Sequence, residues 1–234
     1  MIELNASKRI KEILQMIPSC KIVADIGTDH GILPILLAES GRCEEIIATD
    51  ISRESLDKLV KKLEENPEIN NISTIVSDGL SKITEPYPDV VVISGMGSRL
   101  IIKILEEASD KAKQIKTFIF QPNTTVDELR VYLHDNGYKI INEALVYENN
   151  RFYNILATER NNELYNSKSH YKYGKLLLEN RNENLRKHLL DEKNRFEKLF
   201  KELQTMKNKS QVRIDEIVEE LEIIAEALNY YEII

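Results

Sequence analysis

The residues best suited to chemistry stand where short apolar runs end. The first run ends in a segment with two glycines four residues apart, Asp25-Ile26-Gly27-Thr28-Asp29-His30-Gly31. A glycine turn between a strand and a helix lets a ligand approach the backbone and the helix N-terminus, as nucleotides do in open α/β sheets. Asp29 replaces the middle glycine of GxGxxG, and its carboxylate would repel a diphosphate. The turn therefore favours S-adenosyl-L-methionine, which carries positive charge and no phosphate, over NAD.

Two later apolar runs also end in acids. Asp50 follows Gly27 by 23 residues, close to the spacing of about 20 at which an acid reaches a ribose hydroxyl pair. The next run ends in Ser77-Asp78-Gly79, where Asp78 can accept a hydrogen bond from an adenine amine. Aspartate at a strand end is also common in ordinary turns. Three successive acidic strand ends together indicate a nucleoside-type cofactor.

The fourth and fifth runs end in segments that can border the same crevice. The fourth ends in Ser94-Gly95-Met96-Gly97-Ser98, whose glycines would let a planar base approach the backbone. The fifth ends in Gln121-Pro122-Asn123, which offers amide donors and acceptors. A tight strand-to-helix turn with Met96 as core filler, and a plain loop at Asn123, are the alternatives. His30, inside the first turn, could act as a base or a hydrogen-bond donor.

The elements that must position these residues alternate between strand and helix. The strand candidates are Lys21 to Ile26, Glu45 to Thr49, Ile72 to Val76, Asp89 to Ser94 and Lys116 to Phe120. The helix candidates are Leu33 to Glu39, Arg53 to Glu64, Ser98 to Ala108 and Val126 to Asn136, with Ser52 as an N-cap and Thr125 with Glu128 as a capping box. Tyr138 to Val146 and Phe152 to Thr158 leave room only for a hairpin. A parallel sheet that ends in an antiparallel hairpin is the strand plan of class I methyltransferases, which have a Rossmann-like fold.

The chain after residue 160 has a different character. Leucine, isoleucine and phenylalanine repeat at seven in two stretches, 185–206 and 214–228, with Glu192 as one polar defect, and Lys207 to Ser210 is a plausible turn between them. This pattern predicts an antiparallel coiled-coil hairpin. We therefore expect a catalytic domain over 1–160 and a coiled-coil domain over 161–234.

Charge divides the second domain. Lys168 to Arg213 holds 13 basic and 6 acidic residues, whereas Ile214 to Ile234 holds 7 acidic and no basic residues. Neighbouring helices of opposite charge would attract each other, and a basic face could also bind phosphates.

Composition excludes several classes. With 42% hydrophobic and 30% charged residues, the chain is typical of globular proteins and not of disordered ones. The apolar stretch Ile32 to Ala38 is too short to span a membrane, and the charged N-terminus lacks a signal peptide's apolar core. Cys20 and Cys43 have neither CxxC spacing nor nearby histidines, so we expect no disulfide scaffold, no metal site and a cytoplasmic location.

Three motifs together with the helical hairpin carry a family resemblance. DIGTDHGILPI at 25–35, SGMG at 94–97 and FQPN at 120–123 are similar to segments of the bacterial TrmK family, S-adenosyl-L-methionine-dependent tRNA (adenine-22 N1)-methyltransferases. The resemblance covers nearly the whole chain. This sequence departs from the family pattern at Ile32, where Tyr is expected, and at Ser98, where Gly is expected.

The resemblance implies a role for each matching residue. Asp25, Gly27, Thr28, Asp29 and Gly31 would surround the methionine end of the cofactor, Asp50 would hold the ribose, Asp78 and Gly79 the adenine, and Ser94, Gly95, Met96 and Gly97 would lie at the reacting centre. His30 and Ser77, which stand in the same strand-end turns, are also expected to bind the cofactor. Arg9 would bind the cofactor carboxylate, although an exposed helix arginine is the alternative.

The implied reaction needs little acid–base chemistry. N1 of adenine has an in-plane lone pair, so alignment could supply most of the acceleration, and a carboxylate would stabilise the cationic product. Asp29 is the hypothesis for that carboxylate, and Asn123 for receiving a flipped-out adenine.

The basic helix is the expected tRNA-docking face, and nothing indicates an oligomer. Two alternatives stay open: a class I methyltransferase acting on a small molecule or protein, and a non-catalytic nucleoside-binding protein.

Overall fold

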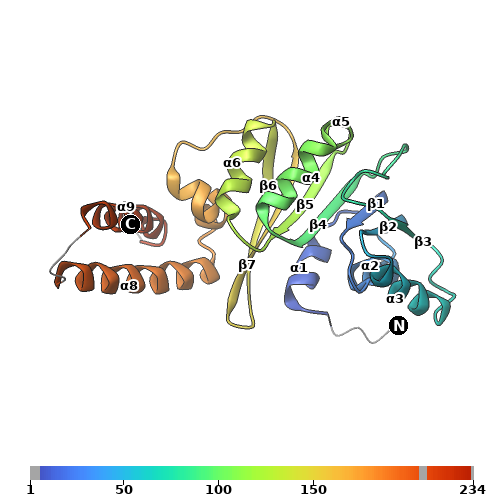
Figure 1. The fold of residues 1–234 in the computed structure, drawn as a ribbon, viewed down its shortest axis with the longest axis horizontal. Helices are drawn as coiled ribbons and strands as arrows, with labels where there is room; N and C mark the ends of the chain where they lie inside the picture. Colours follow the sequence, from blue (N-terminus) through green and yellow to red (C-terminus); the bar gives the residue numbers. More distant parts are fainter. Residues whose placement is uncertain (1–5, 206–209, 233–234) are drawn as a thin grey trace. The chain divides into compact units, whose positions relative to one another are not determined.

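The computed structural model describes residues 6–205 and 210–232. These residues fall into two compact units, which meet in the sequence between Glu163 and Leu164 (Figure 1). The strands are β1 (Cys20–Ile26), β2 (Cys43–Asp50), β3 (Ile72–Val76), β4 (Val90–Met96), β5 (Thr117–Pro122), β6 (Tyr138–Glu148) and β7 (Arg151–Arg160). The helices of the first unit are α1 (Lys8–Met16), α2 (Ile32–Ser40), α3 (Arg53–Glu64), α4 (Ser98–Glu107), α5 (Ser109–Ala112) and α6 (Val126–Asp135).

The first unit is built on one seven-stranded sheet in the order β3-β2-β1-β4-β5-β7-β6. β1 to β5 pair in parallel, and β7 pairs antiparallel with both β5 and β6. The predicted class I methyltransferase fold is confirmed. The strand order reverses between β1 and β4, so the connections on either side of this point lead away in opposite directions and leave a crevice at the carboxyl ends.

The centre of the sheet is buried because its strands are continuous apolar runs. Val23, Val91 and Phe118 on β1, β4 and β5 have no exposed surface. One core cluster joins α1 and α2 to the sheet through Ile13, Leu37 and other side chains. α4 and α6 contact each other in the layer at the front of Figure 1. Such a sheet holds the strand ends, and the side chains on them, in fixed positions.

Helix caps show where local pattern succeeds and where it fails. The Ser52 hydroxyl accepts a hydrogen bond from the Ser55 amide, so the predicted N-cap of α3 is confirmed. The predicted capping box at Thr125 is wrong. Thr125 adopts a left-handed conformation and makes no side-chain cap, and Glu128 instead pairs with Arg99 through two hydrogen bonds of 3.1 Å.

The second unit contains η1 (His170–Gly174), α7 (Lys175–Glu179), α8 (Glu183–Thr205) and α9 (Gln211–Asn229). α8 and α9 pack together as an antiparallel pair, with the Tyr231 hydroxyl donating to the Asn182 carbonyl at the start of α8. The basic stretch that begins at Lys168, which the charge pattern treated as one basic helix, is not one continuous helix. It breaks at Arg181, whose φ is 51°, and the Asn182 side chain then accepts from the Leu185 amide to begin α8. Most of the turn expected at Lys207 to Ser210 lies outside the described residues.

The seam between α8 and α9 contains the heptad positions. Leu185 and Leu189 are buried on α8, and Ile217 and Ile224 are buried on α9. The polar defect, Glu192, accepts a hydrogen bond of 2.9 Å from the Tyr173 hydroxyl. A buried hydroxyl therefore satisfies the carboxylate that interrupts the apolar seam.

Candidate functional site

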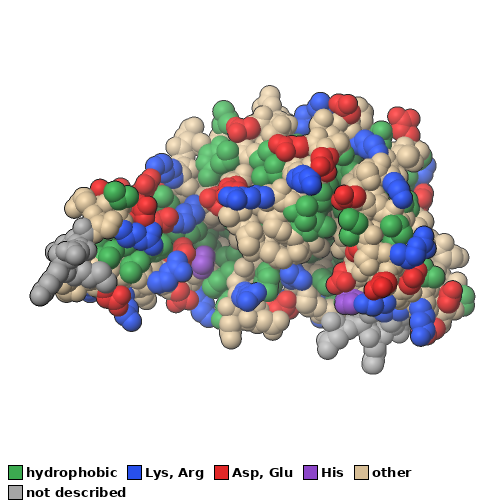
Figure 2. Space-filling view, viewed as in Figure 1, with side chains coloured by type: hydrophobic (Ala, Val, Ile, Leu, Met, Phe, Trp, Pro, Cys, Tyr) green, Lys and Arg blue, Asp and Glu red, His purple; other side chains and the backbone are tan. Residues whose placement is uncertain are grey.

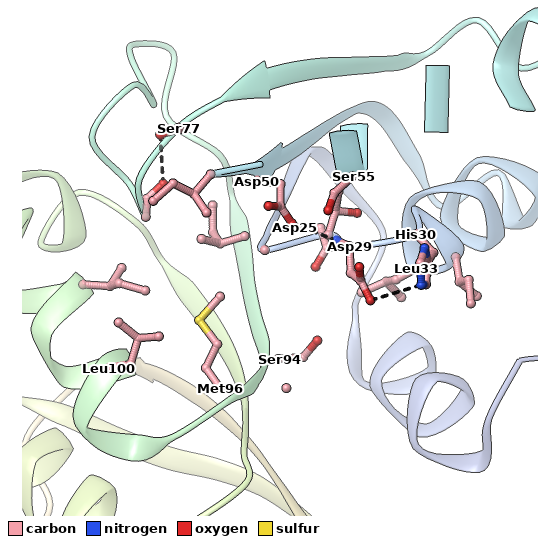
Figure 3. A pocket seen from close by; sticks show the side chains of 18 of the residues that line it. Asp25, Asp29, His30, Leu33, Asp50, Ser55, Ser77, Ser94, Met96 and Leu100 are labelled. Carbon is pink, nitrogen blue, oxygen red and sulfur yellow. Dashed lines mark hydrogen bonds and ion pairs between the residues drawn. The ribbon is translucent and has the colours of Figure 1, made fainter. Parts of the chain in front are cut away.

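A pocket of about 630 Å³ opens at the carboxyl ends of β1 to β4 (Figure 3). It is lined by all but two of the residues predicted to bind the cofactor or act in catalysis, namely Arg9, Asp25, Gly27, Thr28, Asp29, His30, Asp50, Ser77, Asp78, Gly79, Ser94, Gly95, Met96 and Asn123. The exceptions are Gly97, which is the N-cap of α4, and Gly31. Gly31 begins α2 in a left-handed conformation, and a Cβ there would stand 2.5 Å from Leu59 on α3. Gly31 therefore permits helix packing and does not line the pocket.

The lining also includes apolar residues that the sequence analysis missed. They are Ile10, Ile26, Leu33, Ile51, Leu100 and Ile104, together with Ile32 and the polar Ser55. Ile51 is 71% exposed and Leu100 46% exposed, although apolar side chains of this size are usually buried. Ile51 directly follows Asp50, so its place beside the pocket was available from the sequence. Leu100 and Ile104 are one helical turn apart on α4, a signal that carries meaning only once α4 is known to border the pocket.

Asp25 is the most unusual group in the pocket. It is the penultimate residue of β1, is only 3% exposed, and has no Lys or Arg partner among the described residues. Burial raises the pKa of its carboxyl to about 6, the nearby Thr28 hydroxyl opposes that shift although its contact with Asp25 falls short of hydrogen-bond geometry, and the negative charge of Asp50 adds to the shift. The Thr28 hydroxyl is itself buried without a hydrogen-bond partner in the described structure. A buried carboxylate and an unsatisfied hydroxyl on one lining suit a ligand with a positively charged donor group.

Asp50 is held at the mouth of the same pocket by backbone donors. Its Oδ2 accepts from the Asp29 amide at 3.1 Å, and its Oδ1 accepts from the Ser52 amide at 2.8 Å. Each oxygen keeps lone-pair capacity for a further donor. Both amides fix the orientation of the carboxylate, which suits recognition of two adjacent hydroxyls.

Asp29 and His30 lie at the rim. Asp29 has a φ of 51°, its side chain is 71% exposed, and its Oδ2 is 3.6 Å from His30 Nε2. A non-glycine residue in this left-handed region stores backbone strain. The conformation aims the Asp29 amide at Asp50 and leaves the Asp29 carboxylate facing solvent.

The floor near β4 depends on two glycines. Gly27 has a φ of 76°, a backbone conformation that favours glycine, and a Cβ there would also lie 2.3 Å from the flexible methyl end of Met96. A Cβ on Gly79 would lie 2.9 Å from Ile104. Figure 3 shows Met96 and Leu100 across the pocket from Asp25, Asp29 and Asp50, so an apolar wall faces an acidic one.

Other candidate chemistry is absent from the part of the chain that the structure describes. No group of three or more His, Cys, Asp or Glu side chains could hold a metal ion there. Among the same residues no helix is long and apolar enough to cross a membrane. Cys20 and Cys43 are both free, and their Sγ atoms lie 3.1 Å apart where β1 and β2 begin.

Comparison with known proteins gives consistent results. Residues 6–156 match the family model described as a methyltransferase domain. A tRNA (adenine(22)-N(1))-methyltransferase of Bacillus subtilis is 32% identical over 159 residues, which are 68% of this chain and 67% of that protein.

Two solved structures cover nearly the whole chain. A Streptococcus pneumoniae protein in complex with S-adenosyl-L-methionine is 29% identical, with a TM-score of 0.83 over 95% of this chain and 99% of that one. The M. capricolum TrmK in complex with S-adenosyl-homocysteine is 26% identical, with a TM-score of 0.84 over 97% and 99%.

The buried Asp25 carboxyl should make the stability of the ligand-free protein depend on pH. Because its pKa is raised in the folded state, ionisation destabilises the empty protein above pH 6 and has no effect below about pH 4. Asp25→Asn should therefore raise the free energy of unfolding at pH 7 by up to roughly 3 kcal/mol, with the gain shrinking toward pH 4. Urea unfolding of both proteins at several pH values measures this difference in the free energy of unfolding. Asp78→Asn, at an exposed acid of the same pocket, is the matched control and should change little. An Asp25→Asn protein no more stable than wild type at pH 7 would contradict the account of Asp25.

Proposed function

The chain belongs to the TrmK family of tRNA (adenine-22 N1)-methyltransferases, and we propose that it methylates N1 of an adenine in the D-loop of bacterial tRNA, using S-adenosyl-L-methionine. The observation that carries the proposal is the buried, unpaired Asp25 carboxylate in a pocket at the switch point of a methyltransferase sheet. When bound there, the cofactor supplies an electrophilic methyl group.

The lining residues fit the two charged groups at the methionine end of the cofactor. Asp25 would hold the ammonium, since it is buried and lacks a cation. Arg9 would hold the carboxylate, because among the described residues it is the one Lys or Arg on the lining. Its guanidinium stacks over the Tyr153 ring at 4.9 Å, which limits its motion.

The remaining groups fit the nucleoside. Asp50, with both oxygens already oriented by backbone amides, would accept from the ribose hydroxyls. Asp78 and Gly79 would border the adenine ring, and Ile51 supplies an apolar face beside it.

Methyl transfer then requires the chain to place and protect the target base. N1 attacks with its own lone pair, so no residue has to remove a proton first. The chain's part is to align N1 with the methyl group and to exclude water, and Met96 and Leu100 provide an apolar wall for this. Asp29 would stabilise the positive charge that develops on the base.

The activity has a direct test. The full chain, S-adenosyl-L-methionine and unmodified tRNA transcript should yield 1-methyladenosine by nucleoside mass spectrometry, and a transcript with A22 replaced by G should yield none. If a protein that binds the cofactor methylates no nucleoside, the proposal fails, and the small-molecule and sensor alternatives take its place.

Asp29 can be tested without adding strain. Asp29→Gly removes the carboxylate and keeps both the left-handed backbone and the amide that donates to Asp50. We expect kcat to fall roughly tenfold with cofactor affinity nearly unchanged. A normal kcat in Asp29→Gly would remove the carboxylate from the mechanism.

A tRNA substrate implies a cytoplasmic location.

The tRNA-docking face is best sought on α8. Lys168 and Lys172 are engaged by Glu219 and Glu220 of α9, so part of the basic charge is neutralised. Lys198 and Lys201 are exposed on α8, and among the described residues Lys198 pairs only with Glu202 of the same helix, at 4.0 Å. Figure 2 shows basic and acidic side chains interleaved on the visible face of the molecule.

Reversal of charge on α8 separates docking from net charge. Lys198→Glu with Lys201→Glu should weaken tRNA binding roughly tenfold. The slope of log affinity against log salt concentration should also become shallower by about one for each phosphate contact that is lost. Lys113→Glu with Lys116→Glu changes the net charge equally at the opposite end of β5 from the pocket, and should have little effect. Equal effects of the two pairs on affinity, measured by filter binding, would exclude α8 as the docking face.

A further inference from the structure

Gln121 is a fully buried amide that the reaction described above does not use. Its side chain has no exposed surface. Its Oε1 accepts from the Gly95 amide at 3.2 Å, and its Nε2 donates to the Pro122 carbonyl at 3.0 Å and to Asn123 Oδ1 at 3.1 Å. One buried side chain thus joins the end of β4 to the end of β5, at the edge of the pocket.

The same contacts fix the side chain of Asn123, which is exposed on the pocket lining. Asn123 Nδ2 donates to the Gly95 carbonyl at 2.6 Å, and its backbone amide donates to the Met96 carbonyl at 2.8 Å. If the amide of Asn123 were flipped, its Nδ2 donor would face the Gln121 Nε2 donor, and its Oδ1 acceptor would face the Gly95 carbonyl oxygen. Both contacts would then be repulsive. The amide is therefore held in one orientation, with one N–H and one oxygen lone pair left unused.

An unused donor beside an unused acceptor matches one edge of adenine in particular. On the Watson–Crick edge, a donor placed on N1 would occupy the lone pair that has to attack the methyl group. On the Hoogsteen edge, the N6 amino group donates and N7 accepts, which is the pairing that Asn makes with adenine in nucleic-acid complexes. Reading that edge identifies the base and leaves N1 free.

We propose that Asn123 determines base specificity by hydrogen bonding N6 and N7 of the target adenine, and that Gln121 is the positioning residue that orients its amide. This inference rests on the proposed function. The exposed Asn123 amide contacts the base, whereas Gln121 acts through Asn123 and through the backbone of Gly95.

The test replaces N7 of the target adenine, the proposed acceptor for Asn123, by C–H. A tRNA transcript with 7-deazaadenosine at the target position has C–H in place of N7 and keeps the N1 lone pair. Wild-type kcat/KM should be roughly tenfold lower on this transcript than on the adenosine transcript. In Asn123→Ala the ratio between the two transcripts should fall to about one. Asp127→Asn, exposed at the first turn of α6, should keep the wild-type ratio.

The variant Gln121→Met separates a positioning role from a loss of folding. Methionine is about as long as glutamine but carries no amide. It should also lose the discrimination between the two transcripts while cofactor affinity changes little, a result that reduced folding alone would not give. Equal wild-type rates on both transcripts would overturn the inference and leave the proposed function intact. An Asn123→Ala protein that still discriminates would also overturn it. If wild type methylates neither transcript, the proposed function fails and this inference fails with it.

Discussion

The site depends on a carboxylate that the fold buries without a partner. Asp25 stands at the end of the central strand β1, where the strand order reverses and the crevice opens. Its surroundings are apolar on the sheet side and acidic on the Asp50 side, so the protein alone provides little compensation for its charge. A cationic ligand completes this arrangement. The Gly27 turn, the oriented Asp50 and the partner-free Thr28 hydroxyl all lie around the same point.

Much of this arrangement could be predicted because it is local. The β-branched runs predicted β1 to β5, and the strand ends predicted nearly all the polar residues of the pocket. What the sequence did not indicate depends on contacts between distant elements. Gly31 is packed against Leu59 on α3, where a Cβ would not fit. Glu128 accepts hydrogen bonds from Arg99 on α4 and so does not complete a capping box. The Cys20–Cys43 contact follows from the register of β1 and β2, which spacing alone does not give.

Gln121 shows why the remaining part of the site needs a structure. In the sequence it is a polar residue after an apolar run, equivalent to its neighbours. Its burial and its link to Gly95 arise only because β4 and β5 pair in parallel with this register. In the second unit, Glu192 looks like a defect in a heptad pattern until Tyr173 is seen to donate to it. In both cases, a polar group that the pattern leaves unexplained is satisfied by a long-range hydrogen bond.

Proton release on cofactor binding tests the central claim about Asp25 most directly. At pH 6 the carboxyl is about half protonated in the free protein, and a bound ammonium should lower its pKa. Calorimetric titration with S-adenosyl-homocysteine, in buffers of different ionisation enthalpy, should show release of up to about half a proton at pH 6 and much less at pH 8. The release should vanish in Asp25→Asn. Binding without proton release at pH 6, or equal release in Asp25→Asn, would contradict the account.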